Sequence, residues 1–371
     1  MSEADTPREP VEGPGARAHR RGHAAPGPRV SWPIVALVAT IVLGLMATLV
    51  VVISRHASDG GGSSAATSST TPSATPTTSS PSPSPSESAT PSPSPTPTAY
   101  PLGTFTVATT DHTFVDPTRG TMARGSRAAT SNRTLPTSVR YPGNPDGRGP
   151  FPVVVFAEGF NISVRDYAPL LDDLASRGYV VVAPEFPMAT TIYDGNPSQA
   201  DLDNEPGDVR FVLTSVMDTA AAGGPLQGLI DPDRVAIMGH SDGAYVAAVI
   251  GYDPTFRDRR FTAAVILSGQ AGDIHSSPGL DGSPPLLVAH GTADEINPYW
   301  IGPAIQAAVS PPHYLLTIAG ARHLAPFTDA PIRPAVSEVI AAFLDLHLRG
   351  IAGAAETLTA AGNAPGLTLT P

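Results

Sequence analysis

The residues of this 371-residue chain that could do chemistry centre on Ser241, within Gly239-His240-Ser241-Asp242-Gly243. This stretch has the form Gly-x-Ser-x-Gly, in which a serine can sit on a strained turn between a strand and a helix. Chance could also produce the pattern, because the chain contains 35 glycines. A serine hydroxyl is a poor nucleophile unless a base removes its proton. The motif is therefore informative only if the chain also supplies a base and an acid.

The residues on either side of Ser241 have the pattern that such a turn requires. Residues 234–238 (RVAIM) form a short apolar run that predicts a buried strand, and residues 244–250 (AYVAAVI) predict a helix. Gly239 and Gly243 would permit a tight turn and close packing of the helix on the strand. The sequence therefore predicts that Ser241 is a nucleophile at a strand-to-helix turn.

The acid should follow the serine along the chain and should lie in a loop after a strand. Asp294 follows the predicted strand 285–289 and is the candidate acid. An aspartate after a strand can also form an Asx turn or cap a helix. Asp273, after an earlier strand, is the main alternative, and the adjacent Glu295 should point elsewhere.

The base should be a histidine beyond the acid. Three histidines follow Asp294, and only His323 comes directly after a predicted strand, residues 314–318. His313 precedes that strand and would lie at its wrong end, whereas His347 falls inside the predicted last helix. His323 is therefore the candidate base, which would take the serine proton while the acid fixes its tautomer.

An oxyanion hole needs backbone N–H groups directed at the charge that develops on the substrate. One should come from Asp242, directly after the nucleophile, and the second from the loop after the predicted strand 152–156. Phe160 in that loop is the candidate for the second N–H. Its phenyl ring could form a wall of an acyl pocket or simply pack in the core.

The remaining pattern alternates apolar runs, expected to be strands, with amphipathic runs, expected to be helices. The expected strands are 133–141, with its proline at a sheet edge, 152–156, 179–183, 234–238, 261–267, 285–289 and 314–318, and the expected helices are 167–177, 207–218, 301–309 and 333–348. Continuous apolar strands that alternate with helices predict an α/β fold, with a mainly parallel sheet covered on both faces. No insertion is long enough for a large cap domain.

Composition divides the chain into four segments. Residues 1–31 are expected to be a cytoplasmic tail, 32–54 a transmembrane signal anchor, 55–99 a disordered Ser/Thr/Pro-rich linker and 100–371 the catalytic domain. The anchor contains a stretch without charge that is long enough to cross about 30 Å of hydrocarbon as a helix. The linker has almost no apolar side chains that could offset the entropy of ordering it.

The basic residues near the anchor predict its orientation. Arg17, Arg20, Arg21 and Arg29 precede it, whereas Arg55 alone follows closely. The positive-inside rule then places the N-terminus in the cytoplasm and the catalytic domain outside the cell membrane. A cleaved signal peptide is the alternative, but its apolar region and basic leader would normally be shorter.

Composition also limits the classes of site and partner. The chain has no cysteine, so disulfides and thiolate metal sites are excluded, and no His-x-x-x-His pair occurs from residue 100 onward. We expect neither a metal nor another cofactor. The formal net charge is -11, and all 22 basic residues are arginines without a basic run in the acidic C-terminal part. This balance argues against nucleic acid as a partner.

Taken together, these motifs resemble those of the α/β-hydrolase superfamily, and within it those of bacterial serine esterases related to dienelactone hydrolase, platelet-activating-factor acetylhydrolase, chlorophyllase and the cutinase-like enzymes. The resemblance covers roughly residues 133–348, in the segments RTLPTSVRYP, PVVVFAEGF, YAPLLDDLASRGYVVVAPEFP, DRVAIMGHSDGA, PPLLVAHGTADEINP and GARH. It implies Ser241 as nucleophile, Asp294 as acid and His323 as base. It also implies an acyl-enzyme mechanism without a cofactor.

Two acidic features depart from this resemblance or add to it. The family usually has His-Gly where this chain has Glu158-Gly159, and a carboxylate near an oxyanion would oppose catalysis unless it is paired or protonated. The loop 188–206 carries four acidic residues. It could line the cleft or bind a cation, although we expect it to be solvated.

The leading hypothesis is a membrane-anchored, extracytoplasmic serine hydrolase that cleaves small or polymeric carboxylic esters. An acyltransferase on cell-envelope lipids or glycans would use the same residues with a different acceptor. A non-catalytic surface protein that uses the hydrolase fold for binding is a third hypothesis, which the carboxylate of Glu158 favours.

Overall fold

The computed structural model describes residues 105–270 and 282–371. The expected cytoplasmic tail, membrane anchor and linker (1–31, 32–54 and 55–99) lie outside the described residues, as does Asp273. Within the described part, no helix is both long and apolar enough to cross a membrane.

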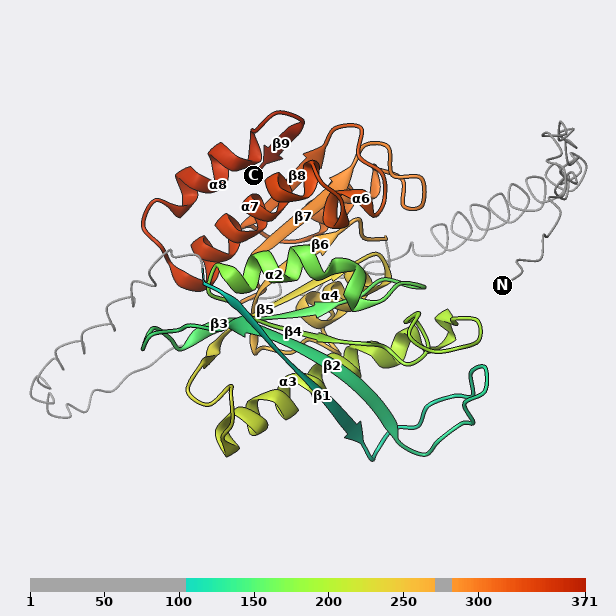
Figure 1. Ribbon diagram of the computed structural model, residues 1–371. Coiled ribbons are helices and arrows are strands. Elements are labelled where there is room, and N and C mark those ends of the chain that lie inside the picture. Colours follow the sequence, from blue (N-terminus) through green and yellow to red (C-terminus); the bar gives the residue numbers. More distant parts are fainter. Residues whose placement is uncertain (1–104, 271–281) are drawn as a thin grey trace, which may run out of the picture. The chain divides into compact units, whose positions relative to one another are not determined.

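A single nine-stranded sheet organises the described part of the chain (Figure 1). The strands are β1 (Val107–Asp116), β2 (Arg133–Pro142), β3 (Phe151–Ala157), β4 (Val180–Pro184), β5 (Ile230–His240), β6 (Phe261–Leu267), β7 (Leu286–Gly291), β8 (His313–Ile318) and β9 (Leu367–Thr370). Their order in the sheet is β1-β2-β4-β3-β5-β6-β7-β8-β9. The six strands from β4 to β8 are mutually parallel, while β1, β2 and β9 pair antiparallel. The predicted α/β fold with a mainly parallel sheet is confirmed.

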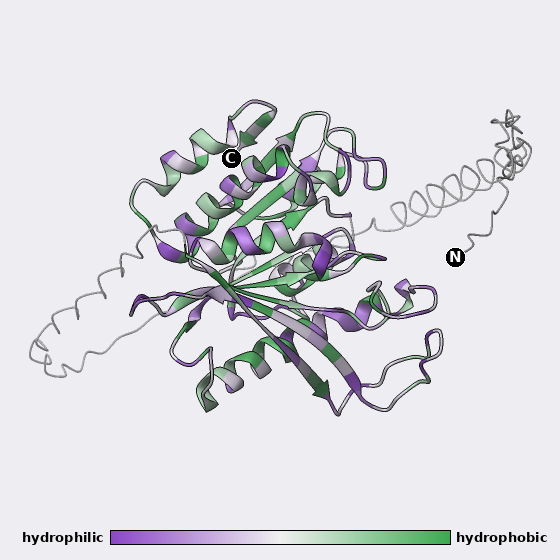
Figure 2. Cartoon of the chain, in the orientation of Figure 1, coloured by the Kyte–Doolittle hydropathy of each residue, from purple (hydrophilic) through white to green (hydrophobic). Residues whose placement is uncertain are grey.

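Helices cover both faces of the sheet because its central strands are apolar on both faces (Figure 2). The helical elements are η1 (Val164–Tyr167), α2 (Ala168–Ser176), η2 (Gln199–Asn204), α3 (Glu205–Ala222), α4 (Asp242–Tyr252), α5 (Ile301–Ala308), α6 (Ala325–Thr328), α7 (Ile332–Leu344), η3 (Asp345–Arg349) and α8 (Ala354–Gly362). Strand β3 shows how the faces alternate. Val153 and Val155 pack with α3, α4 and α5, whereas Val154 and Phe156 pack with α2, α7 and α8.

The expectation that residues 133–141 form an edge strand is wrong. β2 lies inside the sheet, between β1 and β4. Its Pro136 cannot donate a backbone hydrogen bond, yet it faces Thr113 of β1 in the register of this antiparallel pair. Strand β1 was not predicted because its residues are mostly exposed or half-buried and form no apolar run.

The C-terminal part also contains more structure than the sequence indicated. The expected helix 333–348 corresponds to α7 continued by η3, and it ends at Gly350, whose φ is 63°. Helix α8 and strand β9 follow, and β9 pairs with β8 as the last strand of the sheet. The parallel strands bring their carboxyl ends to one edge of the sheet, where we expected the functional residues.

Candidate active site

Ser241 occupies the predicted turn between β5 and α4. Its backbone has φ 56° and ψ -116°, a left-handed conformation that a residue with a side chain rarely adopts. The turn is tight enough that a Cβ at Gly239 would overlap the carbonyl of Gly243, and a Cβ at Gly243 would overlap the carbonyl of Ala157 in β3. Glycine is therefore required at both positions, and the strained turn presents the serine at the carboxyl edge of the sheet.

Asp294 and His323 lie together, as predicted. Nδ1 of His323 is 2.9 Å from Oδ2 and 3.0 Å from Oδ1 of Asp294. The carboxylate also accepts the amides of Ile296, at 3.0 Å, and Asn297, at 2.8 Å. Burial alone would raise the pKa of Asp294, but the hydrogen bonds from His323 and from these amides outweigh it and hold the pKa below its ordinary value.

The proton of His323 can be placed from these contacts. An ionised carboxylate only accepts hydrogen bonds, so Nδ1 of His323 carries the proton that is shared with Asp294. Nε2 is then left with a lone pair when the ring is neutral. A group of this kind can act as a general base toward a neighbouring hydroxyl.

Glu295 makes a different set of contacts. Its carboxylate accepts the guanidinium of Arg322, at 2.9 Å, and the backbone N–H of His323, at 3.3 Å. The Glu295 carboxylate forms no hydrogen bond to the His323 imidazole, which agrees with the expectation that it points elsewhere. The two other C-terminal histidines lie elsewhere. His313 begins β8, at the amino end of that strand, and His347 of η3 packs against the ring of Phe343 of α7.

His323 contacts the residue that precedes the serine. The ring of His240 lies 4.7 Å from the ring of His323, and its Nε2 atom lies 3.1 Å from the His323 carbonyl oxygen. The loop after β3 also reaches the serine, since a Cβ at Gly159 would lie 3.2 Å from Cβ of Ser241. The oxyanion loop therefore lies against the predicted nucleophile, and the predicted base lies against the residue that precedes it.

The two candidate oxyanion donors lie next to Ser241 and Gly159 in the sequence. Asp242 is the first residue of α4, directly after the serine, and Phe160 directly follows Gly159. The phenyl ring of Phe160 is half-buried against the core, which supports packing rather than a free pocket wall. The Asp242 carboxylate accepts hydrogen bonds from the side chains of Gln199, at 2.7 Å, and Gln270, at 3.1 Å. Neither glutamine was singled out from the sequence.

Glu158 is fully buried and turned toward β4. Its Oε1 accepts the backbone N–H of Phe186, at 2.9 Å. Burial and the adjacent carboxylate of Glu185 raise the pKa of Glu158 well above its ordinary value. Glu185 in turn accepts the hydroxyls of Ser163, at 2.8 Å, and Thr190. Burial and the neighbouring carboxylate therefore favour the neutral form of Glu158.

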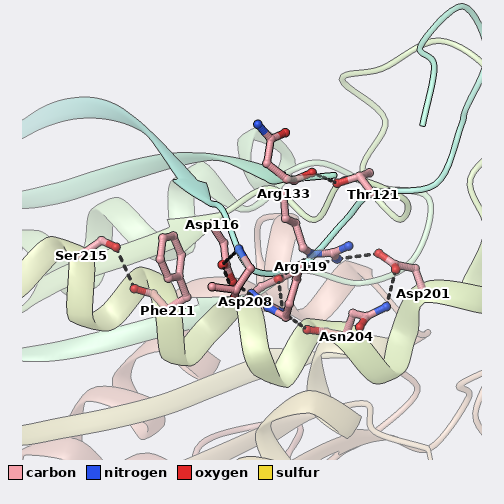
Figure 3. A network of polar contacts seen from close by, with 11 residues as sticks. Asp116, Arg119, Thr121, Arg133, Asp201, Asn204, Asp208, Phe211 and Ser215 are labelled. Carbon is pink, nitrogen blue, oxygen red and sulfur yellow. Dashed lines mark hydrogen bonds and ion pairs between the residues drawn. The ribbon is translucent and has the colours of Figure 1, made fainter. Parts of the chain in front are cut away.

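The acidic loop 188–206 is solvated only in part, since Asp194 and Asp203 are exposed whereas Asp201 and Glu205 are buried. Asp201 is buried and pairs with Arg133 at 2.5 Å (Figure 3). Arg133 is fully buried at the start of β2 and also forms a forked pair with Asp208 of α3, in which both N–O distances are 2.6 Å. In the described ranges, no group of three or more potential ligands could hold a metal ion. The ion pairs of Arg133 thus anchor the loop to the sheet.

Three further residues around the site were missed by sequence reasoning. Tyr167 and His240 are buried beside Gly159, and Nε2 of His290 lies 3.3 Å from Oδ2 of Asp294. His240 fills the variable position of the Gly-x-Ser-x-Gly motif, so the motif itself carries no signal for it. The sequence contains no pattern that would bring Tyr167 to it from another element.

Comparison with known proteins points to a family of ester hydrolases. The family model described as chlorophyllase matches residues 110–281, a range that includes Ser241 but ends before Asp294 and His323. The chain is 32% identical over 120 residues to "Chlorophyllase-1, chloroplastic" of Citrus sinensis and, equally, to that of Citrus unshiu. Each match covers 30% of this chain and 34% of the relative, so the chain spans about a third of the length of these relatives. The chain thus resembles the chlorophyllases, as its motifs predict, and this resemblance is consistent with a serine esterase of the α/β-hydrolase superfamily.

Proposed function

We propose that the chain has the α/β-hydrolase fold and cleaves carboxylic esters through an acyl-enzyme on Ser241, with His323 as base and Asp294 as acid. The observation that carries this proposal is the strained serine turn beside a histidine whose Nδ1 is held by a buried carboxylate. The match to chlorophyllases supports a hydrolase.

The first half of the reaction forms the acyl-enzyme. Oγ of Ser241 attacks the ester carbonyl carbon while Nε2 of His323 takes the hydroxyl proton. Asp294 stabilises the resulting imidazolium and remains ionised throughout. The carbonyl oxygen becomes an oxyanion, which the N–H groups of Asp242 and Phe160 would bind. When the intermediate collapses, the C–O bond breaks and the alcohol leaves with the proton from Nε2.

The second half returns the enzyme to its starting state. Water attacks the acyl carbonyl and gives a proton to Nε2 of His323. The carboxylic acid then leaves, and Oγ of Ser241 recovers its proton from Nε2 of His323. The raised pKa of Glu158 favours both halves, because an ionised carboxylate near the oxyanion would oppose the developing charge.

The proposal is tested by hydrolysis of a p-nitrophenyl ester series of increasing acyl length and by labelling with a fluorophosphonate probe. We expect both activities in the parent protein and neither in Ser241→Ala. Ser215→Ala is a matched control, because this serine bonds within α3 to the carbonyl of Phe211 and lies outside the site. Folded protein that does not label at Ser241 would refute the proposal.

We further propose that residues 32–54 anchor the protein in the cell membrane, with the catalytic domain on the extracytoplasmic side. This rests on the uncharged stretch and on the arginines before it. The oriented anchor would place the esterase site where external esters reach it.

A further inference from the structure

We propose that Tyr167 and His240 form a positioning pair that ties the oxyanion loop to the backbone of the base. The inference deepens the proposed esterase function and rests on it. The pair does not contact the reacting atoms in this arrangement. Instead, it joins three chain segments that must keep a fixed spacing, namely the loop after β3, the end of β5 and the loop after β8.

A continuous series of hydrogen bonds carries the proposal. The backbone N–H of Gly159 lies 3.4 Å from the Tyr167 hydroxyl oxygen, and that oxygen lies 2.7 Å from Nδ1 of His240. Nε2 of His240 then lies 3.1 Å from the carbonyl oxygen of His323. The series thus begins one residue before the candidate oxyanion donor Phe160 and ends on the backbone of the base.

The direction of each hydrogen bond follows from its partners. A carbonyl oxygen only accepts, so the His240 proton must be on Nε2 for that contact to be a hydrogen bond. Burial lowers the pKa of His240 to about 3, with a further contribution from His323, so the ring is neutral and has one N–H. Nδ1 is then an acceptor, and the Tyr167 hydroxyl donates to it. The hydroxyl oxygen remains free to accept the N–H of Gly159.

The packing around the pair leaves little freedom. Tyr167 is fully buried, and the His240 ring is enclosed by the rings of His323, at 4.7 Å, and Phe327, at 5.2 Å. A Cβ at Gly159 would lie 3.0 Å from Nδ1 of His240 and 3.2 Å from the Tyr167 hydroxyl oxygen. Glycine at this position therefore lets the oxyanion loop approach both side chains.

The consequence for catalysis is geometric. The carbonyl of His323 belongs to the residue whose imidazole must reach Ser241, so a shift of that carbonyl also shifts the ring. A misplacement of about 1 Å can cost about 100-fold in rate. The pair would therefore act on kcat, through orientation, rather than on substrate affinity.

The test compares Tyr167→Phe, His240→Leu, the double variant and His240→Gln in the full-length protein. We expect Tyr167→Phe and His240→Leu each to lower kcat about 10- to 100-fold while KM stays unchanged. The double variant should be no slower than the slower single variant, because the two residues act as one unit. His240→Gln should recover part of kcat, since its amide N–H can still donate to the His323 carbonyl.

Tyr252→Phe is the matched control. Tyr252 is also buried, and its hydroxyl donates to the Pro284 carbonyl at 2.9 Å, away from the pair. This variant should lose stability but keep its kcat. A general effect of losing one buried hydroxyl would lower kcat equally in Tyr252→Phe and Tyr167→Phe, and that result would overturn the inference.

Two outcomes separate the inference from the proposed function. Activity that depends on Ser241 but is unchanged in Tyr167→Phe would overturn the positioning role alone, as would additive effects in the double variant. Activity that survives Ser241→Ala would refute the proposed function. A readout independent of activity is the imidazole tautomer, measured by long-range proton–nitrogen NMR with His240→Gln to assign the signal. A proton on Nδ1 of His240 would overturn the proposed series of hydrogen bonds.

Discussion

Nδ1 of His323 lies within 3.0 Å of both carboxylate oxygens of Asp294, although the two residues are 29 positions apart. The side chain of Asp294 is fully buried, and that of His323 is mostly buried. The carboxylate keeps its charge because His323 and two backbone amides donate to it. This arrangement fixes the imidazole with Nε2 free, which is the state that a serine nucleophile needs.

The first prediction concerns the charge of the acid. Asp294→Asn keeps the size of the side chain but allows the opposite tautomer of His323, so kcat should fall by about 10³- to 10⁴-fold. Glu295→Gln is the neighbouring control and should cause a far smaller loss, because Glu295 contacts Arg322 and a backbone amide rather than the imidazole. Steady-state ester hydrolysis measures both. A larger loss of kcat in Glu295→Gln than in Asp294→Asn would show that Glu295, and not Asp294, is the acid.

The second prediction concerns backbone strain at the nucleophile. The φ of 56° at Ser241 corresponds to a cost of about 1–3 kcal/mol, which glycine would largely relieve. Ser241→Gly and Ser241→Ala should both be inactive, but the glycine variant should have the higher free energy of unfolding. Urea denaturation of the two variants compares them directly. An alanine variant that equals or exceeds the glycine variant in stability would contradict this account.

The third prediction concerns the protonation of Glu158. Burial and the nearby Glu185 raise its pKa well above the ordinary value of 4.5 in the folded state, whereas in the unfolded state it ionises near that value. The unfolded state then binds fewer protons above that value. The contribution of Glu158 to stability is fully present below about pH 4.5 and is lost as the pH rises toward the folded pKa.

Glu158→Gln should therefore lose less stability than the parent as the pH rises above about 4.5, as measured by thermal unfolding at a series of pH values. It should also keep most of its kcat, because a neutral side chain replaces a neutral one. Glu356→Gln, on the exposed surface of α8, is the control and should leave the pH profile unchanged. Identical pH profiles in the parent and in Glu158→Gln would show that Glu158 is ionised in the folded protein.

The fourth prediction concerns the buried arginine. Arg133→Met leaves the carboxylates of Asp201 and Asp208 buried without their main cation, so it should cost about 3–5 kcal/mol in the free energy of unfolding. Arg322→Met removes the exposed pair with Glu295 and should leave the Tm unchanged. Equal effects of the two substitutions would show that the cluster in Figure 3 does not anchor the loop.

The fifth prediction concerns orientation in the membrane. Because the chain has no cysteine, Ala24→Cys and Ser58→Cys each introduce a single thiol, before and after the expected anchor. On intact cells, a membrane-impermeant maleimide should label the thiol at position 58 and not the one at position 24. Labelling of both thiols only after lysis would place the catalytic domain in the cytoplasm.

The parts of the fold that could be predicted are those with a strong burial pattern. The runs PVVVF and YVVVA are apolar throughout, because β3 and β4 are covered on both faces, and so they are recognisable as parallel strands. Strand β1 has no such run, since its side chains are mostly exposed or half-buried. The position of Arg133 gave no hint of its burial, because an arginine is normally exposed unless its partners lie in other elements.

The residues of the candidate site also differ in whether the sequence could predict them. Ser241, Asp294 and His323 could be found because each follows a strand and their order is restricted. Tyr167 and His240 could not be found, because they are 73 residues apart and meet only in three dimensions. The protonation of Glu158 likewise depends on Glu185, which is brought to it by the parallel pairing of β3 with β4.

The alternation of β3 between two cores also limits how this scaffold could be re-engineered. Because Val153 and Val155 face one layer of helices and Val154 faces the other, inserting one residue would exchange the two sets. The same insertion would shift Glu158 into the place of Gly159 at the end of the strand, where bare backbone now meets the serine. Loop grafts intended to change the substrate should therefore begin after Gly159.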